Sequence, residues 1–115
     1  MNFQEKVYAI VAKIPKGKVV TYSQIAAMIS TPRAARQVGM ALSRLPQDSD
    51  IPWHRVINAQ GFITIENLSV PKQEQARRLQ KEGIKVVLKN GNYLVDLGRY
   101  LWKIPNHKHQ ITNKF

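Results

Sequence analysis

The sequence predicts a mostly helical α/β domain built around a winged helix-turn-helix with small β-hairpins. Two short amphipathic segments, 22–29 and 32–45, are separated by about three residues, which is the spacing of a helix-turn-helix. The dipeptide Asn90-Gly91 stands between two apolar runs and is the strongest hairpin signal in the chain. A length of 115 residues, of which 43% are hydrophobic, fits one domain with one modest core.

The chain begins with an amphipathic segment. Apolar residues at helical spacing predict a helix over Phe3–Ile14. The stretch Pro15–Lys18 contains a proline and a glycine and predicts the turn that ends this helix. The β-branched pair Val19-Val20 then predicts a short strand.

The helix-turn-helix follows that strand. Thr21 is suited to cap a first helix over Tyr22–Ile29. Ser30 and Thr31 offer a cap for the second helix, Pro32–Leu45, which has a proline at its first position. Such helix pairs also occur in many unrelated helical proteins, so the pattern alone indicates DNA binding only weakly.

The middle of the chain predicts a wing and a third long helix. A polar loop, Pro46–Pro52, leads to Val56–Ile63, which is expected to form two short strands around a turn. Ser69, followed by Pro71, is expected to cap a helix that runs to Glu82 and stops at Gly83.

The C-terminal part predicts a hairpin over Lys85–Leu97, centred on Asn90-Gly91, and a turn of helix over Leu97–Leu101. Residues 103–115 are polar and basic, and we expect them to form a loosely ordered tail.

Basic residues greatly outnumber acidic ones. The chain has 18 Lys and Arg against 7 Asp and Glu, a formal net charge of +11. A small protein with this charge is expected to bind a polyanion, and nucleic acid is the first choice. An anionic membrane surface and a ribosomal RNA site are the alternatives. Membrane binding is disfavoured because the charge is spread over the whole chain and not concentrated on one long helix.

Cysteine is absent, and so is any apolar run of the ~18 residues that a bilayer-spanning helix needs. The N-terminal segment carries Glu5, Lys6 and Lys13 and therefore lacks the apolar region of a signal peptide. These features fit an intracellular protein, cytoplasmic or at the nucleoid, or nuclear in a eukaryote. We expect no cofactor and no metal, since the scattered carboxylates and the His107-Lys108-His109 pair give no convincing ligand spacing.

One motif points to a definite function. Ile51–Val56 reads I-P-W-H-R-V and resembles the I-P-C-H-R-V active-site motif of the O6-alkylguanine-DNA alkyltransferases, with Trp53 in place of the nucleophilic cysteine. Those enzymes transfer an alkyl group to the thiolate, and an indole offers only an N–H donor. The combination resembles the alkyltransferase-like proteins, which bind alkylated DNA without repairing it. We therefore expect no enzyme activity and no catalytic residue.

The resemblance covers about Phe3 to Trp102 and includes further motifs in order, at Val20–Ala26, Ala34–Gly39 and Lys81–Gly83. It implies one DNA-binding domain over residues 1–102, folded like the C-terminal domain of the alkyltransferases, and a tail over 103–115. It also implies a monomer that binds double-stranded DNA containing O6-alkylguanine and marks it for nucleotide excision repair proteins.

The resemblance also assigns the groove-binding residues. Arg36 matches the arginine finger that enters the base stack through the minor groove and fills the place of the flipped nucleotide, a role suited to a planar guanidinium. Considered alone, an arginine on a basic helix is more often a phosphate contact. The implied DNA-contacting set is Thr21, Arg33, Ala34, Ala35, Arg36, Gln37, Gly39 and Arg44.

The flipped base would enter a pocket whose walls lie around the motif. By resemblance the pocket residues are Tyr22, Trp53, His54, Val56 and Ser69. His54 and Glu82 match the base and the orienting carboxylate of the alkyltransferase relay, and without a thiol they are interpreted as a structural remnant. Arg55 is expected to hold the motif loop through buried hydrogen bonds.

A different class remains as the alternative. A generic winged-helix regulator would read an undamaged sequence in the major groove, and the charge and the helix pair permit it. It gives no role to the motif around Trp53, to the Ala-Arg pair at Ala35-Arg36 or to Tyr22. An enzyme of another kind is disfavoured by the lack of a metal-ligand pattern.

Overall fold

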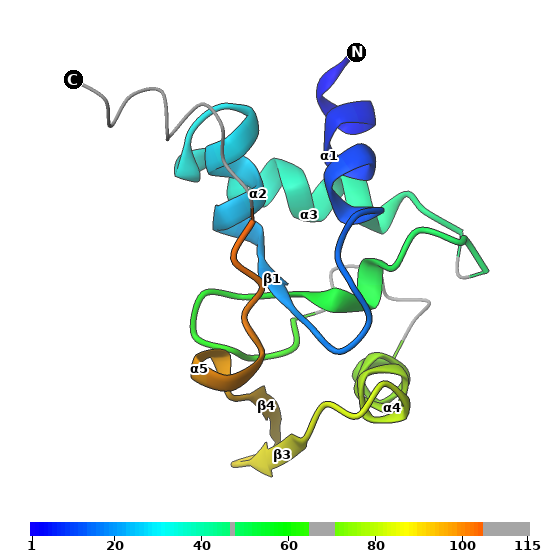
Figure 1. Ribbon diagram of the computed structural model, residues 1–115, viewed down its shortest axis with the longest axis vertical. Coiled ribbons are helices and arrows are strands. Elements are labelled where there is room, and N and C mark those ends of the chain that lie inside the picture. The colour runs from blue at the N-terminus through cyan, green and yellow to red at the C-terminus, as the bar shows by residue number, and fades with distance from the viewer. Residues whose placement is uncertain (47, 65–70, 105–115) are drawn as a thin grey trace.

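The computed structural model describes residues 1–46, 48–64 and 71–104. Figure 1 shows three helices, α1, α2 and α3, in the upper half of the molecule, and α4, α5 and the hairpin β3–β4 in the lower half. A short parallel strand pair, β1–β2, lies between the two halves. The mostly helical fold with small strand pairs that the sequence predicts is confirmed.

Helix α1 spans Phe3–Val11 and begins with a capping box between Asn2 and Glu5. It ends three residues before the predicted Ile14, because Pro15 disfavours helical geometry in the residue before it. The N–H groups of Lys13 and Ile14 instead make tight turns with carbonyls three residues earlier. Ile14 remains buried in the core.

Helix α2 spans Tyr22–Ile29, as predicted, and Thr21 caps it through a capping box with Gln24. The second helix is shorter and less regular than predicted. Pro32–Ala34 form a 3₁₀ turn, η1, and the α-helix α3 occupies only Ala35–Ser43.

Local hydrogen bonding explains why Pro32–Leu45 is not one helix. The side chain of Thr31 does not cap the first turn. That turn is closed by a 3₁₀-type hydrogen bond from the Ala34 N–H to the Thr31 carbonyl, three residues earlier. At the other end, the N–H groups of Arg44 and Leu45 also bond three residues back, just before Pro46 stops the helix.

The predicted wing over Val56–Ile63 is wrong as a hairpin. β2, Val56–Ile57, pairs in parallel with β1, Val20–Thr21, and Phe62 bridges to Leu94 instead. The turn itself exists, since the Asn58 N–H donates to the Phe62 carbonyl at 3.1 Å. Its two arms therefore form their strand pairs with other parts of the chain.

The C-terminal elements follow the prediction closely. α4 spans Lys72–Lys81 with Pro71 at its N-cap, and Gly83 ends it with a φ of +87°. Ser69, the predicted cap, lies outside the described residues. β3 and β4, Val86–Lys89 and Asn92–Val95, form the predicted antiparallel hairpin, and α5 spans Leu97–Tyr100. The predicted loose tail falls almost entirely outside the described residues.

Two buried clusters form the core. One lies among α1, α2 and α3 and includes Val20 and Val56; the other lies among α4, α5 and the hairpin and includes Val19 and Ile57. The parallel strand pair therefore contributes to both clusters and joins the two halves. In the described part of the chain, no helix is long and apolar enough to cross a membrane.

Candidate functional site

The motif loop is a single 3₁₀ turn, η2, at Trp53–Arg55. Pro52 precedes it, and the N–H of Val56 closes it by donating to the Trp53 carbonyl. β2 follows at once and pairs with β1. The loop is thus fixed at its C-terminal end by the strand pair at the centre of the fold.

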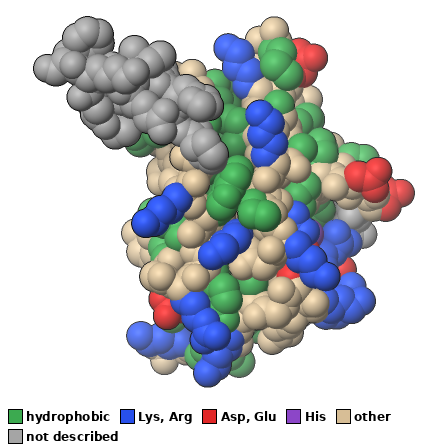
Figure 2. Space-filling model, in the orientation of Figure 1, with side chains coloured by type: hydrophobic (Ala, Val, Ile, Leu, Met, Phe, Trp, Pro, Cys, Tyr) green, Lys and Arg blue, Asp and Glu red, His purple; other side chains and the backbone are tan. Residues whose placement is uncertain are grey.

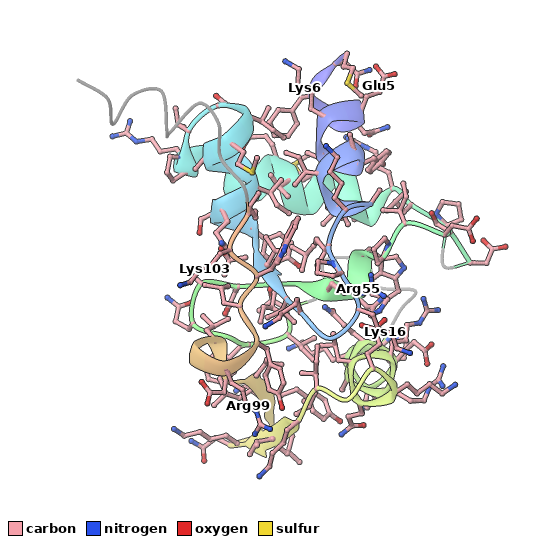
Figure 3. All side chains as sticks on the ribbon, in the orientation of Figure 1. Glu5, Lys6, Lys16, Arg55, Arg99 and Lys103 are labelled. Atoms are coloured by element: carbon pink, nitrogen blue, oxygen red, sulfur yellow. The ribbon has the colours of Figure 1, made fainter. Side chains whose placement is uncertain are left out.

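Glu82 fixes the loop from the other side. Its carboxylate accepts hydrogen bonds from Arg55 Nη2 at 2.6 Å and from Arg55 Nε at 2.9 Å, and His54 Nε2 lies 2.8 Å away. Arg55 Nη1 also donates to the Ile14 carbonyl at 2.6 Å. Figure 3 places Arg55 between η2 and the loop after α1 that carries Lys16. The hydrogen-bond role expected for Arg55 is confirmed.

The ionisation of this cluster follows from its burial and its partners. Burial raises the pKa of Glu82, but the hydrogen bonds from Arg55 and His54 outweigh it and bring the pKa to about 2. Burial lowers the pKa of His54, although Glu82 opposes this. A neutral imidazole beside an ionised carboxylate carries its proton on Nε2. The buried Nδ1 atom has no hydrogen-bond partner among the described residues.

Gln75 of α4 supports the loop backbone. Its side chain is 2% exposed, and its Nε2 donates to the carbonyls of both His54 and Val56 at 2.9 Å. One side-chain amide thereby provides a hydrogen-bond donor for the carbonyl groups of both residues that flank Arg55. The shape of the loop backbone therefore depends on a residue of a different element.

Trp53 is half-buried and contacts two polar side chains. Its ring meets the His54 ring edge-on, with centroids 6.1 Å apart and planes at 89°. The guanidinium carbon of Arg78 lies 4.9 Å from the centroid of the indole. The ring is therefore partly exposed on the motif loop and is not part of the buried core.

Tyr22 and Thr21 lie next to this loop because β1 runs directly into α2. Thr21 pairs with Ile57 and is only 5% exposed, so its side chain serves the helix cap. The Tyr22 hydroxyl donates to the Thr64 carbonyl at 3.1 Å. Tyr22 thus lies beside the segment that leads toward Ser69, which is outside the described residues.

The remaining predicted residues lie on η1 and α3, except Arg44, which is the C-cap of α3. Arg33, Arg36, Gln37 and Arg44 are exposed, so their side chains are accessible to a ligand. Ala34 and Ala35 are half-buried and pack against the upper core cluster, and Gly39 is buried. The basic side chains of this segment are therefore accessible, Ala34 and Ala35 remain partly exposed, and Gly39 lies inside the fold.

Comparison with known proteins identifies the family. A family model described as the DNA-binding domain of 6-O-methylguanine DNA methyltransferase matches residues 2–84. Alkyltransferase-like protein 1 of Schizosaccharomyces pombe is 43% identical over 89% of this chain and 95% of its own length. The chain belongs to the alkyltransferase-like proteins. The DNA base-flipping protein of Escherichia coli is 46% identical over 88% of this chain and 74% of its own length.

Solved structures agree with this assignment to the alkyltransferase-like proteins. The S. pombe protein in complex with damaged DNA containing O6-carboxymethylguanine superposes with a TM-score of 0.83, over 89% of this chain and 95% of that one. The alkyltransferase of Mycobacterium tuberculosis in complex with DNA is 33% identical and gives a TM-score of 0.63, over 72% of this chain and 49% of that one.

This alkyltransferase-like chain is not an enzyme of alkyl transfer. Trp53 occupies the place of the nucleophile in the motif, and the full sequence contains no cysteine that could replace it. Within the described residues, no three His, Asp or Glu side chains come together in a way that would hold a metal ion.

Sequence reasoning missed the part that α4 plays in the site of this alkyltransferase-like protein. The site predicted from the sequence does not include Glu74, Gln75 or Arg78. The available signal was positional, because Gln75 lies beside Ala76 and one turn before Leu79, on the face of α4 that is buried. A polar residue on the apolar face of a helix is expected to find hydrogen-bond partners inside the protein.

Proposed function

We propose that this protein is a non-enzymatic DNA damage sensor. It binds duplex DNA through the minor groove, rotates O6-alkylguanine into a pocket at Trp53 and His54, and flags the lesion for nucleotide excision repair. The observation that carries the proposal is Trp53, a half-buried indole at the position of the motif where the related enzymes have their thiol. The binding of damaged DNA by a relative with the same fold supports it.

Charge supports duplex DNA as the partner. The net charge of +11 favours a polyanion. Figure 2 shows Lys and Arg side chains along the whole length of the visible face, with acidic side chains mostly near its margins. If about six phosphates are neutralised, the affinity falls with salt with a log–log slope near −5.

Arg36 is the proposed plug for the gap left by the flipped nucleotide. It is exposed near the start of α3, where a guanidinium can reach a groove and stack between bases. Arg33, Gln37 and Arg44 are proposed phosphate or sugar contacts, and Ala34 and Ala35 allow the backbone to approach closely. Thr21 and Gly39 are buried, so their proposed contribution is to hold the helix pair in shape.

The proposed pocket takes the flipped base by apolar and aromatic contact. The indole of Trp53 packs against the base or its alkyl group, and backbone groups at Trp53 and Val56 contact the guanine edge. Tyr22 lies beside the nucleotide phosphate, and Ser69 donates to the alkylated oxygen. His54 and Glu82 have no thiol to activate, so they act as scaffold.

The protein acts through the lifetime of its complex and through recruitment, since Trp53 replaces the nucleophile of the motif. Nucleotide excision repair proteins are the proposed partners, and the chain is proposed to be an intracellular monomer. Residues 1–102 form the proposed DNA-binding domain, and 103–115 form a basic tail.

The test compares two matched duplexes, one with O6-methylguanine and one with guanine, at ~150 mM salt. Tighter binding to the lesion, with the methyl group still on the DNA afterwards, is the expected result. Equal binding to both duplexes would contradict the damage-sensor role and favour a generic winged-helix DNA-binding protein. Loss of the methyl group would contradict the non-enzymatic role.

A further inference from the structure

Arg78 of α4 covers the indole that the proposed pocket depends on. Its guanidinium carbon lies 4.9 Å from the centroid of the Trp53 ring. A cation within about 6 Å of an indole centroid is attracted by the negative face of the ring. Trp53 belongs to η2 and Arg78 belongs to α4. The contact between them therefore joins the indole of the motif loop to a separate helix.

The guanidinium is held in place by a carboxylate one turn earlier on α4. Arg78 Nε lies 2.8 Å from Glu74 Oε2, and the side chain of Arg78 is only 27% exposed. Glu74 also accepts two hydrogen bonds from Arg77, at 2.8 and 2.9 Å. A planar guanidinium held at its Nε keeps a defined plane, which a flexible ammonium does not.

The indole is also restrained by the ring of His54. The His54 ring meets it at 89°, and His54 is itself fixed by Glu82 and by the hydrogen bond from Gln75 to its carbonyl. Trp53 is therefore contacted by a guanidinium over its ring and by a fixed imidazole perpendicular to it. A side chain with two such restraints loses little further freedom when a ligand binds.

We propose that Arg78 is a positioning residue that holds the Trp53 indole in place, so that a base enters only against the ring face turned away from α4. This inference rests on the proposed function, because it assigns the ordering of the same pocket. Since a base that stays in the duplex does not contact the indole, the loss of Arg78 weakens lesion binding more than it weakens binding to undamaged DNA.

The experiment uses the full chain carrying Trp102→Phe, so that Trp53 is the only one of the two tryptophans left to fluoresce. In that background we compare Arg78→Met, which removes the charge and keeps the bulk, with Arg78→Lys, which keeps the charge and loses the planar group. Arg77→Met is the matched control, because Arg77 binds the same carboxylate and the ring contact belongs to Arg78. Far-UV circular dichroism checks that each variant is folded.

Two readouts are taken for each variant. Acrylamide quenching of Trp53 in the free protein is expected to increase in Arg78→Met and to stay unchanged in Arg77→Met. The ratio of affinities for the O6-methylguanine and guanine duplexes is expected to fall about fivefold in Arg78→Met and less in Arg78→Lys. Arg77→Met is expected to change both affinities by the same factor, as the loss of one surface charge does.

The outcomes separate this inference from the proposed function. If Arg78→Met and Arg77→Met give the same quenching and the same affinity ratio, Arg78 is an ordinary surface charge and the inference is wrong. If the parent protein itself binds both duplexes equally, the proposed function fails, while quenching still reports whether Arg78 orders Trp53.

Discussion

His54 Nε2 lies 2.8 Å from Glu82 Oε2 in a chain that has no thiol for a histidine to activate. The same carboxylate binds Arg55 and accepts a longer hydrogen bond, 3.5 Å, from the N–H of Gly17. Glu82 therefore connects the loop after α1, the η2 turn and the end of α4. An arrangement that activates a nucleophile in the related enzymes serves here to hold three segments together.

The first prediction concerns the stability of this connection. Glu82→Gln leaves Arg55 with an unpaired, largely buried charge, and we expect the free energy of unfolding to fall by about 3 kcal/mol at pH 7. Urea denaturation measures this loss. The control is Glu74→Gln, which breaks the more exposed ion pairs on α4 and is expected to cost clearly less. Equal losses in the two variants would show that the buried network adds nothing special.

The same carboxylate sets a pH dependence. Its pKa falls from an ordinary value of 4.5 to about 2 on folding, so the unfolded chain binds the proton first. The stabilisation is present above pH 4.5 and is lost as the pH falls toward 2. The unfolding free energy of the wild-type protein should decline over this range more steeply than that of Glu82→Gln. Parallel curves would contradict the assignment.

A second prediction concerns the protonation of His54. Burial lowers its pKa below the ordinary 6.5, so the imidazole stays neutral at a pH where an exposed histidine is already charged. Because the unfolded chain takes up this proton first, stability declines as the pH falls below 6.5 toward the pKa of the folded state. NMR titration of the imidazole signals, with His54→Gln to assign them, should give a midpoint below 6.5. A midpoint at or above that value would mean that Glu82 outweighs burial.

A third prediction tests the buried amide of α4. Gln75→Leu removes the donor shared by the His54 and Val56 carbonyls, and we expect a loss of about 2 kcal/mol in unfolding free energy. Gln80→Leu, the same change at an exposed position of the same helix, is the matched control and should be nearly neutral. Thermal unfolding of both variants decides the point, and similar melting temperatures would refute it.

A fourth prediction concerns the proposed arginine finger. Arg36→Ala should weaken binding to an O6-methylguanine duplex roughly tenfold, because a stacked guanidinium replaces a base in the helix only when the lesion is flipped. Binding to the guanine duplex should fall much less. Arg33→Ala, a nearby exposed arginine, should weaken both duplexes alike as a phosphate contact does. If Arg36→Ala also weakens both equally, Arg36 is only a phosphate contact.

Elements with local signals could be predicted from the sequence. Thr21 caps α2 as predicted, through a capping box with Gln24, and α2 begins and ends where predicted. Asn90 and Gly91 adopt φ values of +51° and +79°, the left-handed pair that a tight hairpin turn needs. In these cases the residues that determine the structure are neighbours in the chain, so a short window of sequence contains the whole cause.

Elements that depend on distant partners were predicted less well. Val56-Ile57 reads as one arm of a hairpin, but its partner is Val20-Thr21, more than thirty residues earlier. The motif predicts a site around Trp53, yet nothing in the neighbouring sequence connects this loop with Arg78 or with Gln75. Those contacts arise because α4 packs against η2, and a helix–loop contact has no periodicity of its own to detect.

The parallel pair β1–β2 determines whether the protein or the DNA changes conformation when the two bind. β1 runs into α2 without a linker, and β2 follows η2 without a linker, while their paired residues are at most 5% exposed. A hinge between the helix pair and the motif loop would have to break this ladder inside the core. The helix pair and the motif loop therefore move together as one rigid body. The rotation that carries a nucleotide from the helix pair to the motif loop has to come from the bending and rotation of the DNA backbone.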